Sequence, residues 1–311
     1  MKTTLSGKEL SKIGIGTYGI GGRGHRDVTL TEQEDDTKYI NAVSYSLTKG
    51  SNFTEISAGY GHGNAMKLFA KGLADSSIKR EDLFLTNSLY PRDLTSLATA
   101  KKDLEEFYKI LTTDYADSIL VTQSFVAKFG QDETYALLHE MLDKNRARYV
   151  SISNSGPLFI KAFKDEFGDS VFAHEGHLSF EVRALEQKGV FKLCNELDIL
   201  NIVWRPLRRN RTMQNNWELL SKLSEKYDKT QNQIILNWIC SLNYYPMVMS
   251  ADPSHIDENL ASTDFTMAQS DYEQLTNFRP SNYNPPEVDW EKNGKGDSIV
   301  TLVTDFEKHL N

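Results

Sequence analysis

Cysteine is scarce in this chain of 311 residues, which contains only Cys194 and Cys240. Two thiols cannot build a disulfide framework, so the composition favours a reducing compartment. Basic residues are also in the minority: 35 lysines and arginines stand against 43 aspartates and glutamates, for a net charge of −8. This balance argues against a nucleic-acid-binding surface, which needs clustered positive charge, while still allowing a local basic pocket.

Long hydrophobic runs are absent as well. No apolar stretch approaches the roughly 20 residues that a membrane-spanning helix needs. Residues 1–7 lack the apolar core of a secretory signal. We therefore expect a cytoplasmic protein with no membrane partner. The 39% of hydrophobic and 25% of charged residues are an ordinary globular composition, and the length suits one large domain.

Short apolar runs alternate along the chain with longer amphipathic stretches. Residues 35–48 place apolar side chains at helical spacing, and Lys49-Gly50 then provides a glycine C-cap. Eight nearly continuous apolar strands separated by helices predict an α/β fold, a parallel sheet closed into a single (β/α)8 TIM barrel. The expected strands are residues 13–17, 53–57, 83–87, 118–122, 149–153, 177–180, 201–204 and 247–250.

The two ends of the chain differ from the middle in their sequence pattern. Residues 1–12 are expected to form a β-hairpin, and residues 13–278 the barrel. The segment 279–311 begins with a loop rich in proline, asparagine, glycine and charge. It continues with apolar side chains at helical spacing over residues 299–310, which predicts an extra helix packed against the barrel. Residues 1–311 are thus predicted to be one domain.

Several short motifs follow one another in a specific order over residues 1–278. They lie at residues 50–61 (GSNFTEISAGYG), 80–85 (REDLFL), 114–121 (DYADSILV), 150–154 (VSISN), 204–207 (WRPL), 238 (W) and 258–260 (ENL). In order and spacing they resemble the motifs of the aldo-keto reductase family. The resemblance implies the barrel fold and an oxidoreductase that uses a nicotinamide to reduce a carbonyl group.

Reduction in that family uses a tyrosine as proton donor, with a lysine, a histidine and a carboxylate around it. The resemblance assigns the proton donor to Tyr60 and the carboxylate to Glu55, which is one methylene longer than the usual aspartate. Ser88 stands at the lysine position and Thr122 at the histidine position. A phenol has a pKa near 10 unless a cation lowers it, so Tyr60 is predicted to be a weak acid and ordinary carbonyl reduction to be slow.

The resemblance also implies a bound NADP(H) or NAD(H). Ser153 and Asn154 match the residues that hold the nicotinamide carboxamide, and Trp204 matches the ring that stacks on the nicotinamide. Met249 and His255 replace the lysine and arginine that usually grip the 2′-phosphate, so that grip is expected to be weak. The expected cofactor-binding residues are Thr17, Ser153, Asn154, Trp204, Arg205, Leu207, Ser250, His255, Glu258 and Asn259.

Two further arginines, Arg208 and Arg209, follow the turn at residues 204–207. They can supply the missing positive charge for a phosphate, or they can be solvated loop residues. The pair His174 and His177 does not predict a metal site, because strand residues three apart point to opposite faces and only one can face the interior.

His177 and Glu181 are expected near Glu55 and Tyr60 at the carboxyl ends of the strands, where barrel enzymes keep their chemistry. Two carboxylates, a phenol and an imidazole suit proton transfer. Arginines nearby would suit an anionic small-molecule ligand. The same charges can instead form structural salt bridges, for instance Glu181 with Arg205.

Three functions therefore stay open. The first is a nicotinamide-dependent oxidoreductase with an altered set of catalytic residues. The second is a non-redox acid–base enzyme, an isomerase or lyase, in which Glu55, Glu181 or His177 moves protons. The third is a pseudoenzyme that binds a ligand without catalysis. A monomer or weak oligomer is expected in each case, by analogy with the family.

Overall fold

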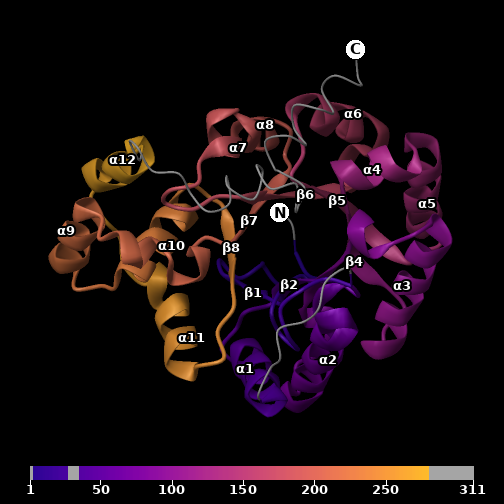
Figure 1. The fold of residues 1–311 in the computed structure, drawn as a ribbon, viewed down its shortest axis with the longest axis horizontal. Coiled ribbons are helices and arrows are strands. Elements are labelled where there is room, and N and C mark those ends of the chain that lie inside the picture. Colours follow the sequence, from indigo (N-terminus) through magenta and orange to yellow (C-terminus); the bar gives the residue numbers. More distant parts are fainter. Residues whose placement is uncertain (1–2, 27–34, 280–311) are drawn as a thin grey trace.

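The strands of the computed structural model form one closed parallel barrel. Residues 3–26 and 35–279 are described. The strands pair in the order β1-β2-β3-β4-β5-β6-β7-β8, and β8 pairs again with β1 (Figure 1). Their bounds are β1 Gly14–Gly16, β2 Phe53–Ile56, β3 Phe84–Leu89, β4 Ala116–Thr122, β5 Ala147–Ser153, β6 Val171–His177, β7 Leu200–Trp204 and β8 Tyr245–Val248.

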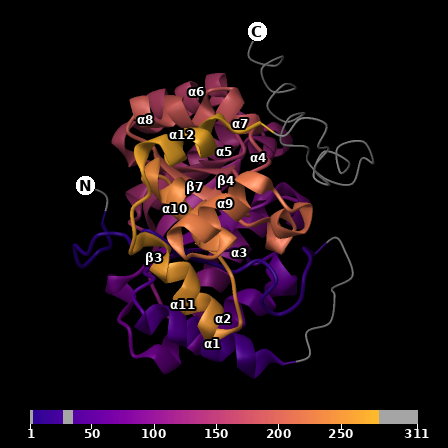
Figure 2. The same cartoon turned by 90° about the vertical axis from the view of Figure 1, so that its left-hand side faces the viewer.

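Helices surround this barrel on all sides in the view of Figure 1, and Figure 2 shows the same layer from the side of α9 to α12. Most follow a strand and cover its outer face, as expected for right-handed βα units. The bounds are α1 Asp36–Thr48, α2 Asn64–Ser76, α3 Leu97–Ile110, α4 Gln123–Phe129, α5 Gln131–Asp143, α6 Pro157–Phe167, α7 Ala184–Gln187, α8 Val190–Glu196, α9 Glu218–Tyr227, α10 Gln231–Ser241, α11 Pro253–Leu260 and α12 Gln269–Asn277.

Side chains fill the barrel in two chemically different layers. Toward the amino ends of the strands a small apolar cluster includes Phe53, Phe84 and Phe172, with the last two rings stacked 4.0 Å apart. Toward the carboxyl ends the interior side chains are polar, among them Glu55 and Glu175. The apolar layer closes one end of the barrel, so a ligand has access from the other.

The predicted eight-stranded barrel is confirmed, and the hairpin region contains an antiparallel bridge between Thr3 and Glu9. One strand prediction was wrong: the sixth strand is Val171–His177, and the expected segment 177–180 only begins at its end. The strand escaped notice because its second half is polar and its pairing with β5 contains a bulge. The predicted helix over residues 299–310 lies outside the described residues. None of the helices in the described ranges has the length and apolar character of a membrane span.

Candidate active site

An open cavity lies at the carboxyl ends of the strands. Counted with its mouth, it has a volume of about 1550 Å³. Its floor carries two carboxyl groups, Glu55 and Glu175, and the two phenols of Tyr60 and Tyr90. The position agrees with the rule that barrel enzymes place chemistry at this end.

A chain of hydrogen bonds connects the two phenols to Glu55. The Tyr60 hydroxyl donates to the Tyr90 oxygen at 3.0 Å, and the Tyr90 hydroxyl donates to Glu55 Oε1 at 3.2 Å. Tyr60 follows β2 in the 3-10 turn Tyr60–Gly63, and Tyr90 follows β3. Among the described residues, the partner of the Tyr60 hydroxyl is another phenol and not a cation.

Burial dominates the acidity of these groups. It raises the pKa of Glu55 to about 7, although hydroxyl groups of Ser88, Tyr60 and Tyr90 act in the opposite direction. Burial, with the neighbouring charge of Glu55, raises the pKa of Glu175 well above its ordinary value. The pKa of Tyr60 is also raised well above 10, by burial first and by Glu55 next. Near neutral pH the floor is therefore largely protonated, and Glu55 is the group that titrates there.

Ser88 and Thr122 lie where the lysine and histidine of the family were expected, but neither reproduces their chemistry. Ser88 is buried beside Glu55, and its hydroxyl affects the pKa of that carboxyl without making a hydrogen bond of normal geometry. Thr122 is the N-cap of α4: its hydroxyl accepts from the Phe125 amide at 3.1 Å. Thr122 thus starts a helix and does not line the cavity.

His177 and Glu181, the two other expected proton carriers, are both packed away from the cavity. The His177 ring stacks on Trp204 with 4.3 Å between centroids, and burial lowers its pKa well below 6.5. Glu181 pairs with the buried Arg208 and accepts further hydrogen bonds from Thr212, Asn215 and Trp217. A carboxylate with this many donors has a structural role.

Two expectations about the neighbouring arginines are corrected by this arrangement. The salt bridge of Glu181 involves Arg208 and not Arg205. Arg208 is also not a solvated loop residue, because it is 1% exposed and its charge is neutralised inside the protein. Arg209 remains exposed, with its guanidinium 5.3 Å from the centre of the Tyr18 ring.

The residues expected around the nicotinamide ring meet at one wall of the cavity. The Asn154 side-chain oxygen accepts from the Trp204 indole N–H at 3.1 Å, and the Ser153 hydroxyl donates to the Glu175 carbonyl at 3.0 Å. Asn154 has φ 50°, which turns the chain after β5 toward the cavity. The expected residues that line the cavity are Thr17, Ser153, Asn154, Trp204, Arg205 and Leu207.

The residues expected around the adenosine lie beyond β8, outside this cavity. Ser250 and Asn259 line a neighbouring cleft of about 410 Å³, and Val248 and Met249 border both spaces. His255 is exposed on α11, and the Glu258 carboxylate accepts from the Thr230 hydroxyl at 2.6 Å. The residues expected at the two ends of the cofactor thus lie in two neighbouring spaces, one inside the barrel mouth and one along β8 and α11.

Several cavity residues were missed from the sequence. Glu175 lies two residues before His177 on β6, so correct strand bounds would have placed it on the same interior face. Tyr90 lies two residues after Ser88 and escaped because it follows the predicted strand. No sequence signal marks His25 and Asp93, which come from loops and meet at 2.7 Å between Nδ1 and Oδ2.

The mouth of the cavity is rich in arginine. Arg23 and Arg209 come from the loops after β1 and β7, and Arg92 and Arg205 also line the opening. Although Arg209 is exposed, partial desolvation at the mouth lowers its pKa, and the like charge of Arg23 contributes to that lowering. Because both carboxyl groups of the floor have raised pKa values, the net charge of the lining is positive near neutral pH.

Residues 12–279 match the family described as the Aldo/keto reductase family. The chain belongs to this family. It is 24% identical over 284 residues to an uncharacterized oxidoreductase of Bacillus subtilis, YtbE, covering 88% of this chain and 91% of the relative. It is 23% identical over 273 residues to the glyoxal reductase of B. subtilis, covering 87% and 89%. It is 28% identical over 214 residues to a yeast NADPH-dependent alpha-keto amide reductase, covering 65% and 68%.

Solved aldo-keto reductases have the same fold. A thermostable aldo-keto reductase, Tm1743, in complex with epalrestat superimposes with a TM-score of 0.77 at 22% identity, covering 88% of this chain and 97% of that one. An aldo-keto reductase of Bombyx mori in complex with NADP gives 0.71 at 19% identity, covering 93% and 96%. The barrel is thus a scaffold that this chain shares with them, and a shared scaffold does not by itself fix the chemistry.

Proposed function

We propose that this aldo/keto reductase reduces small anionic carbonyl compounds with a nicotinamide cofactor, and that a carboxyl–tyrosine relay replaces the lysine–tyrosine pair. The observation that carries the proposal is the hydrogen-bonded chain from Glu55 through Tyr90 to Tyr60. It ends in the same cavity as Ser153, Asn154 and Trp204.

The residues present fit the ring end of a nicotinamide cofactor. Asn154 and Trp204 are already in contact at the cavity wall, and both expose polar or aromatic groups to it. They would hold the carboxamide and the ring. When bound, the nicotinamide supplies a hydride to the carbonyl carbon. The fit at the outer end is poorer, because exposed His255 and apolar Met249 replace cationic partners of a 2′-phosphate.

The chain's own residues supply the proton. The Tyr60 hydroxyl donates to the carbonyl oxygen as negative charge develops there. In the structure Tyr60 donates to Tyr90 and Tyr90 donates to Glu55, so the two hydroxyls must first turn around. Tyr90 then donates to the Tyr60 oxygen, and protonated Glu55 donates to Tyr90. Each hydroxyl passes one proton and receives another, so no phenolate accumulates. The raised pKa of Tyr60 is then no obstacle, because Glu55, with a pKa of about 7, is the acid at the end of the relay.

The charge of the mouth selects the substrate class. Arg23 and Arg209 lie at the opening and form a positive rim. Guanidinium groups bind carboxylates and phosphates through paired hydrogen bonds. The proposal is therefore a carbonyl compound that carries a carboxylate or phosphate, such as a 2-oxo acid.

The relay predicts a specific effect of removing one hydroxyl. Tyr90→Phe should lower kcat by about 10- to 100-fold because it interrupts proton transfer, a step worth about 10²–10⁴-fold in general acid–base catalysis. Binding of NADH or NADPH, measured by quenching of tryptophan fluorescence, should not change. The kcat of the wild type should fall as pH rises through about 7, because Glu55 loses its proton there.

The control is Tyr135→Phe, which removes a buried hydroxyl on α5 that has no hydrogen-bond partner among the described residues. Glyoxylate and butanal serve as the charged and uncharged substrates. A Tyr90→Phe protein as active as the Tyr135→Phe protein would rule out the relay. Absence of NADH and NADPH binding at millimolar concentration would rule out the reductase itself.

A further inference from the structure

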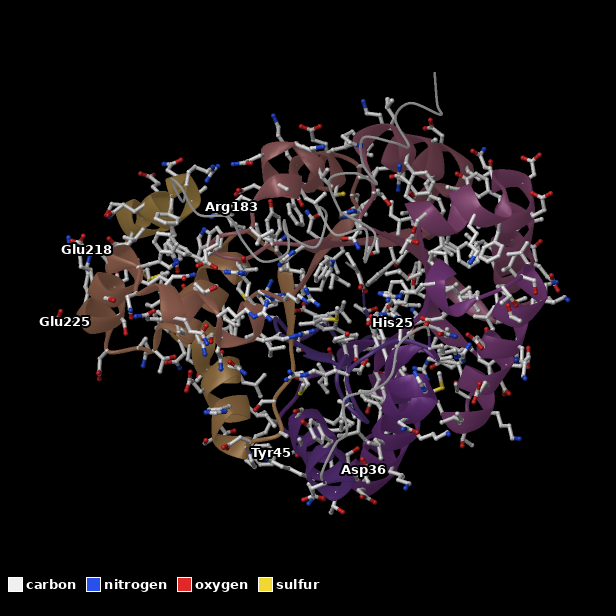
Figure 3. The ribbon with its side chains drawn as sticks, viewed as in Figure 1. His25, Asp36, Tyr45, Arg183, Glu218 and Glu225 are labelled. Atoms are coloured by element: carbon white, nitrogen blue, oxygen red, sulfur yellow. The ribbon has the colours of Figure 1, made fainter. Side chains whose placement is uncertain are left out.

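The loop after β1 brings a histidine–aspartate pair to the cavity. His25 lines the cavity, and its Nδ1 lies 2.7 Å from the Asp93 carboxylate. Because a carboxylate only accepts hydrogen bonds, Nδ1 carries the proton in the neutral imidazole, and Nε2 presents its lone pair. Among the described residues, Nε2 has no hydrogen-bond partner. Figure 3 shows His25 within the ring of strands.

This pair is fixed from several sides. The Arg26 amide donates to the second oxygen of Asp93 at 2.9 Å, and the Arg26 guanidinium makes two bonds to Asp103 of α3, at 2.9 and 3.0 Å. A Cβ at Gly59 would lie 1.9 Å from Asp93 Oδ2, so the aspartate needs glycine there. Lys128 of α4 donates to the carbonyl oxygens on either side of the aspartate, at residues 91 and 94. Such support is typical of an oriented catalytic base.

The imidazole lies directly beside the phenols of the floor. The centre of the His25 ring is 5.1 Å from that of Tyr60 and 5.3 Å from that of Tyr90, both nearly perpendicular. Tyr18 completes the enclosure at 5.7 Å. A base thus lies next to the Tyr60 hydroxyl, which donates to Tyr90 in this structure and can turn to donate to a ligand, above a largely protonated carboxyl floor. Enolisation requires a base beside the carbon that loses its proton. It also requires neutral hydrogen-bond donors that can stabilise the enolate oxygen.

We infer that the cavity catalyses a second reaction that needs no cofactor: enolisation of an anionic ketone, with His25 as the catalytic base. His25 Nε2 takes a proton from the carbon next to the carbonyl group. The C–H electron pair forms the carbon–carbon double bond, and the carbonyl electrons move onto oxygen, which accepts a hydrogen bond from Tyr60. Return of a proton from Nε2 to carbon restores the ketone. No oxidant or reductant is consumed, so the inference goes beyond the proposed reductase.

The experiment is deuterium exchange in D₂O without any nicotinamide. The probe is 2-oxobutanoate, and proton NMR follows loss of the signal of the protons at C3. The wild type should exchange them faster than buffer alone, with a rate that saturates as the probe concentration rises. His25→Gln should lower the rate by about 100-fold, within the range expected for a general base. Tyr135→Phe, remote from the cavity, should not change it.

Asp93→Asn provides a second variant should His25→Gln fail to fold, because it keeps the imidazole but removes the group that fixes its tautomer. It should lower the rate at least tenfold. The inference is overturned if the wild type exchanges neither 2-oxobutanoate nor dihydroxyacetone phosphate faster than buffer alone does. It is also overturned by equal rates in the wild type and whichever of these two variants folds. Because no nicotinamide is present, failure of the proposed reductase does not affect this result.

Discussion

At the scale of single residues, the proposed reaction takes its acidity from a carboxyl group and not from a lysine beside the tyrosine. Tyr60 has a phenol as its partner in place of an ammonium, and the nearest group that titrates near neutral pH is Glu55. Burial raises the pKa values of Glu55 and Glu175, so both carboxyl groups hold their protons more strongly than in water. The proposed reaction therefore depends on a protonated carboxyl and not on a phenolate.

The raised pKa of Glu55 has a direct consequence for stability. Its folded pKa of about 7 lies above the ordinary 4.5, so folding favours the protonated form. This contribution is fully present below about pH 4.5 and is lost as pH rises through about 7. Glu55→Gln keeps the neutral form at every pH, so its free energy of unfolding relative to the wild type should increase between pH 5.5 and 8.5, by about 2 kcal/mol.

Urea unfolding at both pH values measures this difference. Glu140→Gln is the matched control, because Glu140 lies partly exposed at the surface and is paired with Lys101 and Lys144, which lower its pKa to about 2. Its ionisation does not change between pH 5.5 and 8.5. A Glu55→Gln effect as independent of pH as that of Glu140→Gln would show that Glu55 is ionised throughout this range.

At the scale of secondary-structure elements, we expect the segment from the end of β8 into α11 to decide which nicotinamide cofactor binds. It presents Met249 and exposed His255, and its N-cap Asp252 is an acidic residue that accepts from the Ser254 amide at 2.9 Å. The 2′-phosphate of NADPH would meet little positive charge in this segment, and the carboxylate of Asp252 would repel it. NADH should therefore bind more tightly than NADPH.

Met249→Lys combined with His255→Arg should strengthen NADPH binding by about tenfold or more, since charge-assisted hydrogen bonds contribute about 1.5–3 kcal/mol each. The NADH dissociation constant should stay within about twofold and serves as the internal control. Fluorescence titration measures both. An equal increase in affinity for NADH and NADPH would show that the 2′-phosphate does not bind at residues 249 and 255.

The elements also show what the sequence can and cannot predict. Seven strands could be predicted from the sequence because each is a nearly continuous run of apolar residues. The remaining strand, β6, was predicted at the wrong residues because His174, Glu175 and His177 make its second half polar. For the same reason Glu175 was not predicted to lie in the cavity. His25 and Asp93 are 68 residues apart and come from loops, where no periodicity exists to predict a contact. Residues that were assigned from a motif, such as Tyr60 and Asn154, do line the cavity. Residues without a motif, such as His25 and Tyr90, lie outside the regular elements and were not predicted.

At the scale of the whole molecule, Arg183 connects the middle of the chain to its last described helix. Its guanidinium donates to the carbonyl oxygens of Leu275 and Thr276 in α12, pairs with Glu186, and lies 4.5 Å from the ring centre of Trp238. Arg183 is 3% exposed, so its loss leaves the Leu275 carbonyl oxygen without this donor and removes the nearer of the two arginines that pair with Glu186.

Arg183→Met should lower the free energy of unfolding by about 3–5 kcal/mol, the range for breaking a buried ion pair. Urea unfolding followed by circular dichroism should still show one transition. Lys192→Met is the control, because the Lys192 side chain is 83% exposed and its pair with Glu196 is a surface contact. A loss no larger than that of Lys192→Met would mean that α12 contributes nothing to the stability of the barrel.

The arginine-lined mouth belongs to a molecule whose overall charge is −8. A positively charged solid support attracts the acidic outer surface and repels the rim formed by Arg23 and Arg209. Protein immobilised on such a support will therefore attach with its opening directed away from the matrix. Adsorption to an anion-exchange resin is then a simple way to orient this protein without a tag or a chemical cross-link.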